Sequence, residues 1–131
     1  PSTGRTLWNW PWPGKSNGDA NVSQPHQIGE NQVFLSKGYA AGSQLLKLNL
    51  DGEQIWKVQK IWSNATLLKT KFTSAVVVGG YAFGLSDGIL ECVEVANGER
   101  RWKDNRQGRF GHGQLLCVAD QLLILSEDGR L

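Results

Sequence analysis

The segment Asn97-Gly98-Glu99-Arg100-Arg101-Trp102 decides how this sequence folds, because two related segments precede it. Asp51-Gly52-Glu53-Gln54-Ile55-Trp56 and Thr3-Gly4-Arg5-Thr6-Leu7-Trp8 share its order of a small polar residue, glycine, three further residues and tryptophan. The tryptophans are 48 and 46 residues apart, and the glycines keep the same two spacings. Recurrence at a period in this range is typical of repeat proteins. The chain is therefore predicted to consist of repeated structural units.

A second recurring feature is a short apolar run that ends in serine and leads into a turn. It occurs at Val33–Ser36, Ala82–Ser86 and Leu122–Ser126, each followed by a glycine-containing turn. The serines are 50 and 40 residues apart, so the two spacings differ. This difference indicates that the loops joining the units are unequal in length.

The clearest unit reads as four strands joined by tight turns. Gly79-Gly80 is a hairpin signal, and the turns that follow also contain glycine. The predicted strands of this unit are Thr73–Val78, Tyr81–Leu85, Ile89–Val95 and Glu99–Lys103. Consecutive strands with tight turns predict an antiparallel meander.

The preceding unit repeats this plan, and the two ends of the chain carry parts of further units. Its strands are predicted at Pro25–Ile28, Gln32–Ser36, Leu45–Leu50 and Glu53–Val58. We expect the chain to divide into a closing strand of a truncated blade (1–12), a linker (13–24), a blade (25–58), a linker (59–71), a blade (72–104), a linker (105–112) and the first strands of a truncated blade (113–131).

The polarity of the strands predicts a β-propeller. The second strands, such as Leu122–Leu125, are apolar on both faces and must be covered on both sides. The fourth strands, such as Glu99–Lys103, are mostly polar with one large aromatic, which suits an outer edge. We therefore predict an all-β fold, a partial β-propeller of four-stranded antiparallel blades. A two-sheet sandwich is the alternative, but it does not explain the tryptophan spacing.

Composition excludes several classes of protein. The net charge of +2 is too balanced to predict nucleic acid as a partner. Two cysteines exclude a disulfide-dense scaffold and a four-cysteine zinc site. No apolar run approaches the roughly 18 residues of a membrane helix, so membrane insertion is not expected. Helical repeats are excluded because no segment keeps a helical period.

The repeat resembles that of pyrroloquinoline-quinone (PQQ)-like β-propellers, the quinoprotein alcohol dehydrogenase-like superfamily. The family pattern is an alanine-x-aspartate stretch followed by Thr-Gly-x-x-x-Trp, the tryptophan-docking motif. Thr3–Trp8 matches the second half fully, and Leu90–Trp102 matches with cysteine, glutamate and asparagine as replacements. Leu45–Trp56 lacks one residue and has Asn49 at the aspartate position. The resemblance covers almost the whole chain and implies a fragment of about two and a half blades.

The docking motif is expected to be structural. Glycine adopts a turn conformation with positive φ at no steric cost. The indole can pack between neighbouring blades, burying about 200 Å², while its N–H donates to a backbone carbonyl of the next blade. The residues predicted for this role are Gly4, Trp8, Gly52, Trp56, Gly98 and Trp102.

The resemblance implies a possible cofactor, PQQ with calcium, but it identifies no residue that would bind it. Dehydrogenases of the superfamily use acidic and amide ligands, an aspartate base and often a disulfide between adjacent cysteines. Cys92 and Cys117 are not adjacent and are interpreted as free thiols. Nearly all acidic residues lie at predicted turns, and His26 and His112 have no visible partners. We therefore assign no catalytic and no metal-binding residue.

The segment Trp8-Asn9-Trp10-Pro11-Trp12 has two interpretations. Alternate residues of an extended segment point the same way, so Trp10 and Trp12 could form an aromatic platform for a sugar or peptide. The alternative, which we favour, is a linker stiffened by proline whose rings cover a blade.

The expected function is that of a non-catalytic scaffold or protein-interaction surface. An open propeller exposes apolar faces, so a protein partner or self-association through those faces is expected. A fragment of a PQQ-dependent dehydrogenase is the alternative, and carbohydrate binding by the tryptophans is a weaker one. The resemblance also implies an extracytoplasmic location, in the periplasm or cell envelope.

Overall fold

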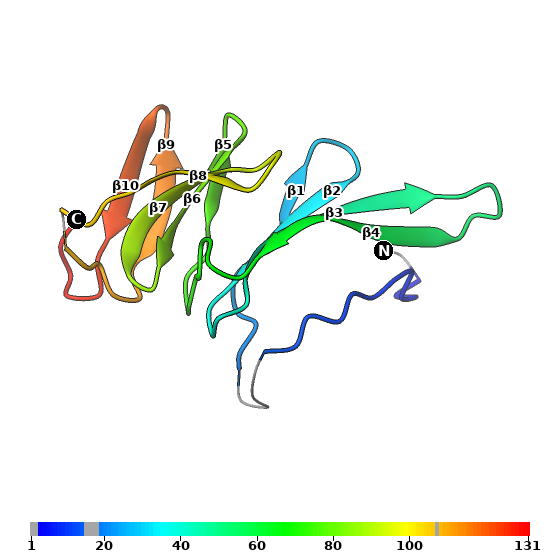
Figure 1. Cartoon of the computed structure of the whole chain (residues 1–131), viewed down its shortest axis with the longest axis horizontal. Coiled ribbons are helices and arrows are strands. Elements are labelled where there is room, and N and C mark those ends of the chain that lie inside the picture. Colours follow the sequence, from blue (N-terminus) through cyan, green and yellow to red (C-terminus); the bar gives the residue numbers. More distant parts are fainter. Residues whose placement is uncertain (1–2, 15–18, 107) are drawn as a thin grey trace.

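Ten β-strands form three antiparallel sheets in the computed structural model, which describes residues 3–14, 19–106 and 108–131. These residues contain no helix, and therefore none that could cross a membrane. The sheets follow one another along the molecule in chain order, from β1–β4 through β5–β8 to β9 and β10 (Figure 1). This series of three sheets differs from the two facing layers of a sandwich. The predicted all-β, partial-propeller fold is confirmed.

The first sheet has four strands in sequential order. They are β1 (His26–Ile28), β2 (Gln32–Lys37), β3 (Gly42–Leu50) and β4 (Trp56–Asn64). Phe34, Leu45 and Trp62 lie side by side on β2, β3 and β4. The β3–β4 ladder shifts by one residue between Leu45 and Leu46.

The second sheet repeats this arrangement with a shorter final hairpin. Its strands are β5 (Val76–Val78), β6 (Tyr81–Ser86), β7 (Ile89–Glu94) and β8 (Glu99–Lys103). Phe83, Cys92 and Trp102 lie side by side on β6, β7 and β8. The ladder shifts between Cys92 and Val93, one residue after the aligned position, as in the first sheet. Phe34 therefore corresponds to Phe83, and Trp62 corresponds to Trp102.

The third sheet contains two strands, β9 (Gln114–Val118) and β10 (Gln121–Leu125), within the described part of the chain. Its apolar side chains stay largely in contact with solvent. The most exposed are Leu116, Val118 and Leu125, at 59%, 49% and 49%. The other face of this sheet, with Leu115, Cys117, Leu122 and Ile124, is half-buried, and β9 contacts β5 of the second sheet. One face of the third sheet is therefore partly covered and the other is exposed.

The core lies between the first and second sheets. It is formed by buried side chains from both sheets and from the segment that joins them: Phe34, Leu45, Leu67, Leu68, Ala75, Ala82, Val93 and Val95. Ile28, Trp62 and Val77 pack against this cluster. β2 and β6 lie in this covered region, as the sequence predicted for the second strands. The prediction is wrong for Leu122–Leu125 in the third sheet, where Leu123 and Leu125 are 37% and 49% exposed.

Hydroxyl groups join the segments that precede the inner strands β1 and β5. The Ser23 and Ser36 hydroxyls each lie 2.7 Å from the Thr70 hydroxyl. Ser23 Oγ also donates to the Thr73 carbonyl at 2.7 Å. Thr70 and Thr73 are buried, and Ser36 is 6% exposed, so these bonds satisfy polar groups that water does not reach.

The fourth strand of the first sheet lies later in the chain than the sequence predicted. We expected Glu53–Val58 and a linker over 59–71, whereas β4 runs from Trp56 to Asn64. Asp51 is the reason for the late start, because its Oδ1 accepts hydrogen bonds from the backbone N–H groups of Glu53 and Ile55 and holds a wide turn. The division into blades and linkers stays a prediction.

The N-terminal segment also differs from the expectation. We predicted the closing strand of a truncated blade over 1–12, but residues 3–14 contain no strand. A strand needs a neighbour to pair with, and no strand of the described residues pairs with this segment. Residues 1–2, residues 15–18 of the predicted linker 13–24, and residue 107 of the linker 105–112 lie outside the described residues.

Candidate functional site

The joint between the first two sheets is made by Trp62 of β4. Its Nε1 donates a hydrogen bond of 2.9 Å to the carbonyl of Val95, which follows β7. Its ring packs directly on Gly98, where an added Cβ would lie 2.8 Å from the indole carbons. On its own sheet, the ring lies 6.1 Å from the Phe34 ring at 53°. The indole is thus fixed by one hydrogen bond and two packing contacts.

The turn that receives Trp62 is shaped by its own residues. Asn97 Oδ1 accepts a hydrogen bond from the Glu99 N–H, and the Gly98 N–H donates to the Glu94 carbonyl. Gly98 has a φ of +70°, which residues with a Cβ rarely adopt. Two constraints therefore require glycine at position 98: the positive φ of the backbone and the space that the Trp62 indole occupies.

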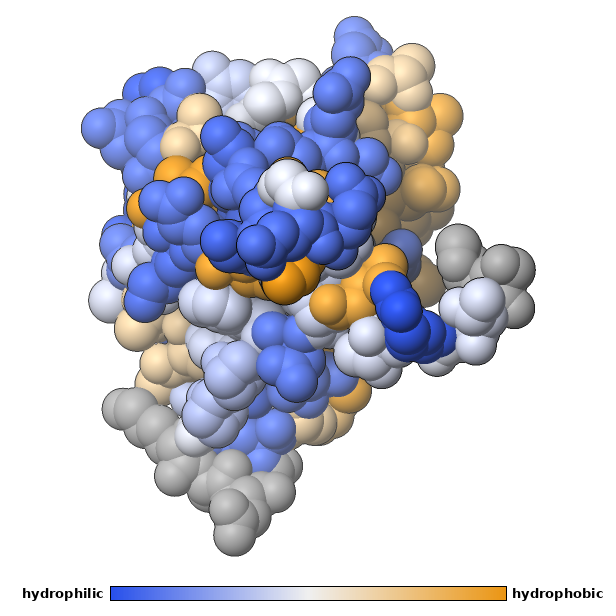
Figure 2. All heavy atoms as spheres, turned by 90° about the vertical axis from the view of Figure 1, so that its right-hand side faces the viewer, coloured by the Kyte–Doolittle hydropathy of each residue, from blue (hydrophilic) through white to orange (hydrophobic). Residues whose placement is uncertain are grey.

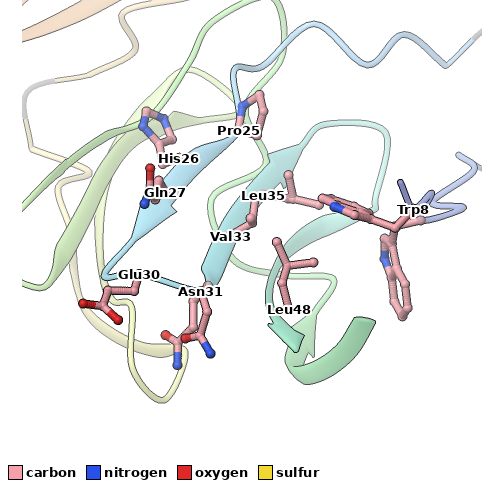
Figure 3. Close-up of a pocket in the computed structure, with 11 residues that line it drawn as sticks. Trp8, Pro25, His26, Gln27, Glu30, Asn31, Val33, Leu35 and Leu48 are labelled. Carbon is pink, nitrogen blue, oxygen red and sulfur yellow. The ribbon is translucent and has the colours of Figure 1, made fainter. Parts of the chain in front are cut away.

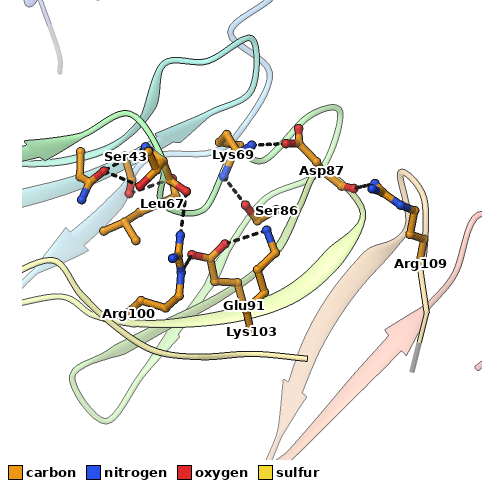
Figure 4. A network of polar contacts seen from close by, with 11 residues as sticks. Ser43, Leu67, Lys69, Ser86, Asp87, Glu91, Arg100, Lys103 and Arg109 are labelled. Atoms are coloured by element: carbon orange, nitrogen blue, oxygen red, sulfur yellow. Dashed lines mark hydrogen bonds and ion pairs between the residues drawn. The ribbon is translucent and has the colours of Figure 1, made fainter. Parts of the chain in front are cut away.

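A buried ionic group lies at the same junction (Figure 4). The side chain of Glu91 on β7 is fully buried, and its Oε1 accepts a 2.7 Å hydrogen bond from Arg100 Nε. Lys103 Nζ lies 3.7 Å from the other carboxylate oxygen. Arg100 Nη2 donates to the carbonyl of Thr66, in the segment between the sheets. Arg100 therefore connects the second sheet to the segment that leads into it.

Asp87 provides a second polar connection, toward the third sheet (Figure 4). Its carboxylate pairs with Lys69, whose backbone N–H donates to the Ser86 hydroxyl. The Asp87 carbonyl accepts a hydrogen bond from Arg109 Nη1 at 2.6 Å. Residues before β5, after β6 and before β9 are therefore joined through a single turn.

The second sheet carries an equivalent of the Trp62 joint that is open. The rings of Phe83 and Trp102 lie 6.0 Å apart at 45°, close to the values for Phe34 and Trp62. Trp102 is 42% exposed. The ring pair borders a pocket of about 370 Å³ that is also lined by Tyr81, Cys92 and Arg101. In the first sheet, the corresponding position is occupied by the turn containing Gly98.

The sequence interpretation gave the role in the first joint to Trp56, whereas the bond to the next sheet comes from Trp62. Trp56 pairs with Leu50 at the far end of the β3–β4 hairpin. The sequence does indicate that this strand continues as far as Trp62. Residues 53–63 contain no glycine, proline, asparagine or aspartate, the residues that commonly end a strand. A strand that continues to Asn64 places Trp62, and not Trp56, opposite Leu45.

Gly4 and Gly52 differ in conformation. Gly4 has a φ of +65°, close to that of Gly98, and an added Cβ there would meet no atom within 4 Å. Gly52 also has open space around it but lies in the hairpin turn without a positive φ. Of these two glycines, only Gly4 therefore has a backbone conformation like that of Gly98, on which Trp62 packs.

The tryptophans near the N-terminus lie against the first sheet. Trp8 and Trp10 line a pocket of about 480 Å³ whose wall includes Leu35 and Leu48, and Figure 3 shows Trp8 beside these two residues. The Trp10 Nε1 is buried without a hydrogen-bond partner. The Trp12 carbonyl accepts a 3.5 Å hydrogen bond from Lys37 Nζ. A platform made by Trp10 and Trp12 together stays a prediction.

The described residues do not fit a calcium-bound quinone. They contain no group of three or more His, Cys, Asp or Glu side chains that could hold a metal ion. Cys92 and Cys117 are both free thiols, and burial raises the pKa of Cys92. Burial lowers the pKa of His26, against a weaker opposite effect of its hydrogen bond with the Ala75 backbone.

The repeated four-stranded sheets and the tryptophan joint define a propeller-type repeat protein. The family described as PQQ_2, Outer membrane protein assembly factor BamB, matches residues 1–129, and the chain belongs to this family. The resemblance inferred from the sequence is therefore confirmed. No curated protein matches the chain.

Proposed function

We propose that this chain is a non-catalytic propeller segment that serves as a scaffold and docking surface for other proteins. The observation that carries this proposal is the open joint on the second sheet. Phe83 and Trp102 are arranged as in the occupied joint, yet Trp102 is 42% exposed. Exposed tryptophans at pockets are typical of sites where protein interfaces gain most of their binding energy.

The exposed apolar side chains of the third sheet support the same proposal. Leu116, Val118, Leu123 and Leu125 are each at least 37% exposed. At the other end of the molecule, apolar groups lie among hydrophilic ones (Figure 2). Leu7 and Ile55 are each 53% exposed. Apolar surface of this kind is typical of proteins that bind other proteins.

The cell envelope is the proposed location of this activity. The matching family is described by its role in outer membrane protein assembly. A chain of this family that docks proteins would therefore meet envelope proteins as its partners. We extend that description to this chain as part of the proposal.

Photo-crosslinking tests the proposed function. A photoreactive residue is placed at position 102, and a matched control is placed at Lys57, whose side chain is 70% exposed on the β3–β4 hairpin. In cells that export the chain, position 102 is expected to crosslink to an envelope protein, identified by mass spectrometry, and position 57 is not. Equal labelling from both positions, or none from position 102, would contradict the proposal.

A ligand titration separates this function from that of a dehydrogenase segment. PQQ with calcium is added to the purified chain, and its absorbance spectrum is followed. We expect no saturable change. A tight, saturable change would instead support the dehydrogenase alternative.

Carbohydrate binding is a second candidate, favoured by the pocket next to the N-terminal tryptophans. Trp8 and Trp10 line it together with the polar residues Gln27, Glu30 and Asn31. Aromatic faces with neighbouring amides suit sugar rings, which carry both apolar faces and hydroxyls. A glycan array tests this candidate with the wild type and with Trp10→Ala. If the pocket binds carbohydrate, the wild type binds a glycan on the array and the variant does not.

A further inference from the structure

The turn between β7 and β8 contains a chemically reactive pair of residues. Asn97 is exposed to solvent and is followed directly by Gly98. Where glycine follows asparagine, the backbone nitrogen of the glycine can attack the carbon of the side-chain amide, because the glycine has no Cβ to hinder the approach. Asparagine is for this reason one of the residues that heat damages in proteins. Exposure alone therefore leaves Asn97 open to this reaction.

The folded turn restrains both of the groups that would react. The Gly98 N–H donates to the Glu94 carbonyl at 2.9 Å, so the proton that the attacking nitrogen must lose is already held in a hydrogen bond. The Asn97 side chain is fixed at both ends. Its Oδ1 accepts a hydrogen bond from the Glu99 N–H, and its Nδ2 donates to Glu94 Oε2, each at 2.9 Å. The attack requires these bonds to break, so the turn must open first.

Trp62 restrains the same turn from the first sheet. Its indole packs on Gly98, and its N–H donates to the Val95 carbonyl two residues before Asn97. The backbone from Val95 to Gly98 is therefore held between the two sheets while the indole stays in place. The local opening that frees Asn97 is the opening of the joint between the first and second sheets.

We propose that Asn97 is a modification site that reacts only when this joint opens, and that the reaction then weakens the joint permanently. The Gly98 nitrogen loses its proton to water and bonds to the side-chain carbon of Asn97. The bond from that carbon to Nδ2 breaks, and the nitrogen takes up a proton and leaves as ammonia. Water then hydrolyses the cyclic imide to aspartate or isoaspartate, with no oxidation or reduction. The modification is independent of the docking function proposed above, because it needs no partner.

Either product disturbs the turn. Aspartate at position 97 places a second negative charge beside Glu94, where the Asn97 amide had been a hydrogen-bond donor. Arg101, which pairs with Glu94, offsets only part of this repulsion. Isoaspartate routes the backbone through the former side chain and lengthens the turn by one methylene, which moves Gly98 away from the indole that packs on it. The joint closes less well after either change.

Peptide mapping by mass spectrometry tests the proposal on the purified chain. Samples are kept in one mildly alkaline buffer, either folded or unfolded in guanidinium chloride. Deamidation at position 97 is followed separately from that of the second Asn-Gly pair, Asn17-Gly18. We expect position 97 to react at least about tenfold more slowly in the folded chain, because the reaction there requires local opening.

Two matched variants show whether the joint controls the reaction. Trp62→Phe lacks the hydrogen bond to the Val95 carbonyl, so the joint opens more often and Asn97 is expected to react about fivefold faster or more in the folded chain. Trp56→Phe changes a tryptophan at the far end of the β3–β4 hairpin and should react like the wild type. Circular dichroism checks that both variants fold, and the comparison of folded with unfolded wild type needs neither of them.

The modified molecules provide a second readout. Ion exchange separates them by their added negative charge, and peptide mapping selects the fraction changed at position 97. This fraction is expected to melt at a lower temperature than the unmodified chain. Three results would overturn the proposal: equal rates at position 97 in the folded and unfolded chains, equal rates in the two folded variants, or a modified fraction as stable as the unmodified one.

Discussion

At the scale of the residue, one indole and one glycine define how neighbouring sheets meet. Trp62 gives its N–H to the Val95 carbonyl and its ring face to Gly98. The ring supplies apolar area, about 200 Å² for a buried tryptophan, and the N–H fixes its direction. A smaller apolar residue at position 62 would retain neither contribution in full.

The hydrogen bond of Trp62 can be separated from its packing. Trp62→Phe keeps an aromatic ring against Phe34 and Gly98 but leaves the Val95 carbonyl without its donor. We expect the free energy of unfolding to fall by about 1 to 3 kcal/mol, measured by urea denaturation. Trp56→Phe is the matched control and should change it by less than about 0.5 kcal/mol. Equal losses for both variants would argue against a special role for Trp62.

The stability of the fold should fall in mild acid because of His26. Burial lowers the pKa of this imidazole in the folded chain below its ordinary value of 6.5. The unfolded chain therefore binds the proton more readily, and unfolding becomes easier as pH drops through and below 6.5. The melting temperature should decrease from about pH 7 to about pH 5, and His26→Gln should reduce this decrease.

Asp51 and Asp128 titrate at lower pH than His26. Hydrogen bonds with the Ile55 backbone and with Ser126 lower the pKa values of Asp51 and Asp128, respectively, below the ordinary 3.8. Their contribution to stability is lost only as pH falls below 3.8. A pH slope between about 5 and 7 that is identical in the wild type and in His26→Gln would show that His26 does not cause it.

At the scale of the element, the β3–β4 hairpin shows what the sequence could and could not predict. Glycine turns and alternating apolar runs were enough to predict the strands of the second sheet closely. The predicted register of the β3–β4 hairpin was wrong. Asp51, Gly52 and Trp56 have the spacing of the glycine and tryptophan motif, but the Asp51 side chain holds a wider turn that delays the start of β4. Local spacing cannot reveal that Trp62 faces the next sheet, since this depends on pairing with Leu45.

The β7–β8 hairpin depends on its buried carboxylate. Glu91→Gln replaces a buried carboxylate with a neutral amide. The positive charges of Arg100 and Lys103 then lose their negative partner. Because Arg100 is partly exposed, we expect a loss of about 1 to 3 kcal/mol in the free energy of unfolding, less than for a fully buried pair.

An exposed pair on the same hairpin provides the comparison. The side chain of Glu99 is 64% exposed and lies 3.7 Å from Arg101, so Glu99→Gln should cost less than about 0.5 kcal/mol. High salt should reduce the small Glu99 effect and leave most of the Glu91 effect, because buried charges are screened less. A Glu91→Gln variant as stable as Glu99→Gln would contradict a structural role for the buried group.

At the scale of the whole molecule, the three sheets follow one another in chain order, and Trp62 joins the first sheet to the second. The antiparallel order of the strands follows from the glycine turns. The number of sheets does not follow from the glycine and tryptophan motif, because Thr3–Trp8 forms no strand and the third sheet contains no such motif. The open pair Phe83 and Trp102 could not be predicted in the same way, because exposure depends on which neighbour is present. The exposed side chains of Trp102 and Leu116 support the docking function proposed for the chain.

A double-mutant cycle between Trp62 and Gly98, read as free energies of unfolding, tests the central claim that this pair joins the two sheets. Gly98→Ala alone should be strongly destabilising, because its Cβ would lie 2.8 Å from the indole at a φ of +70°. Trp62→Ala removes that clash, so the double variant should lose less than the sum of the single losses, by about 1 to 2 kcal/mol. Losses that simply add would mean that the indole and the glycine act independently, and the joint described here would be wrong.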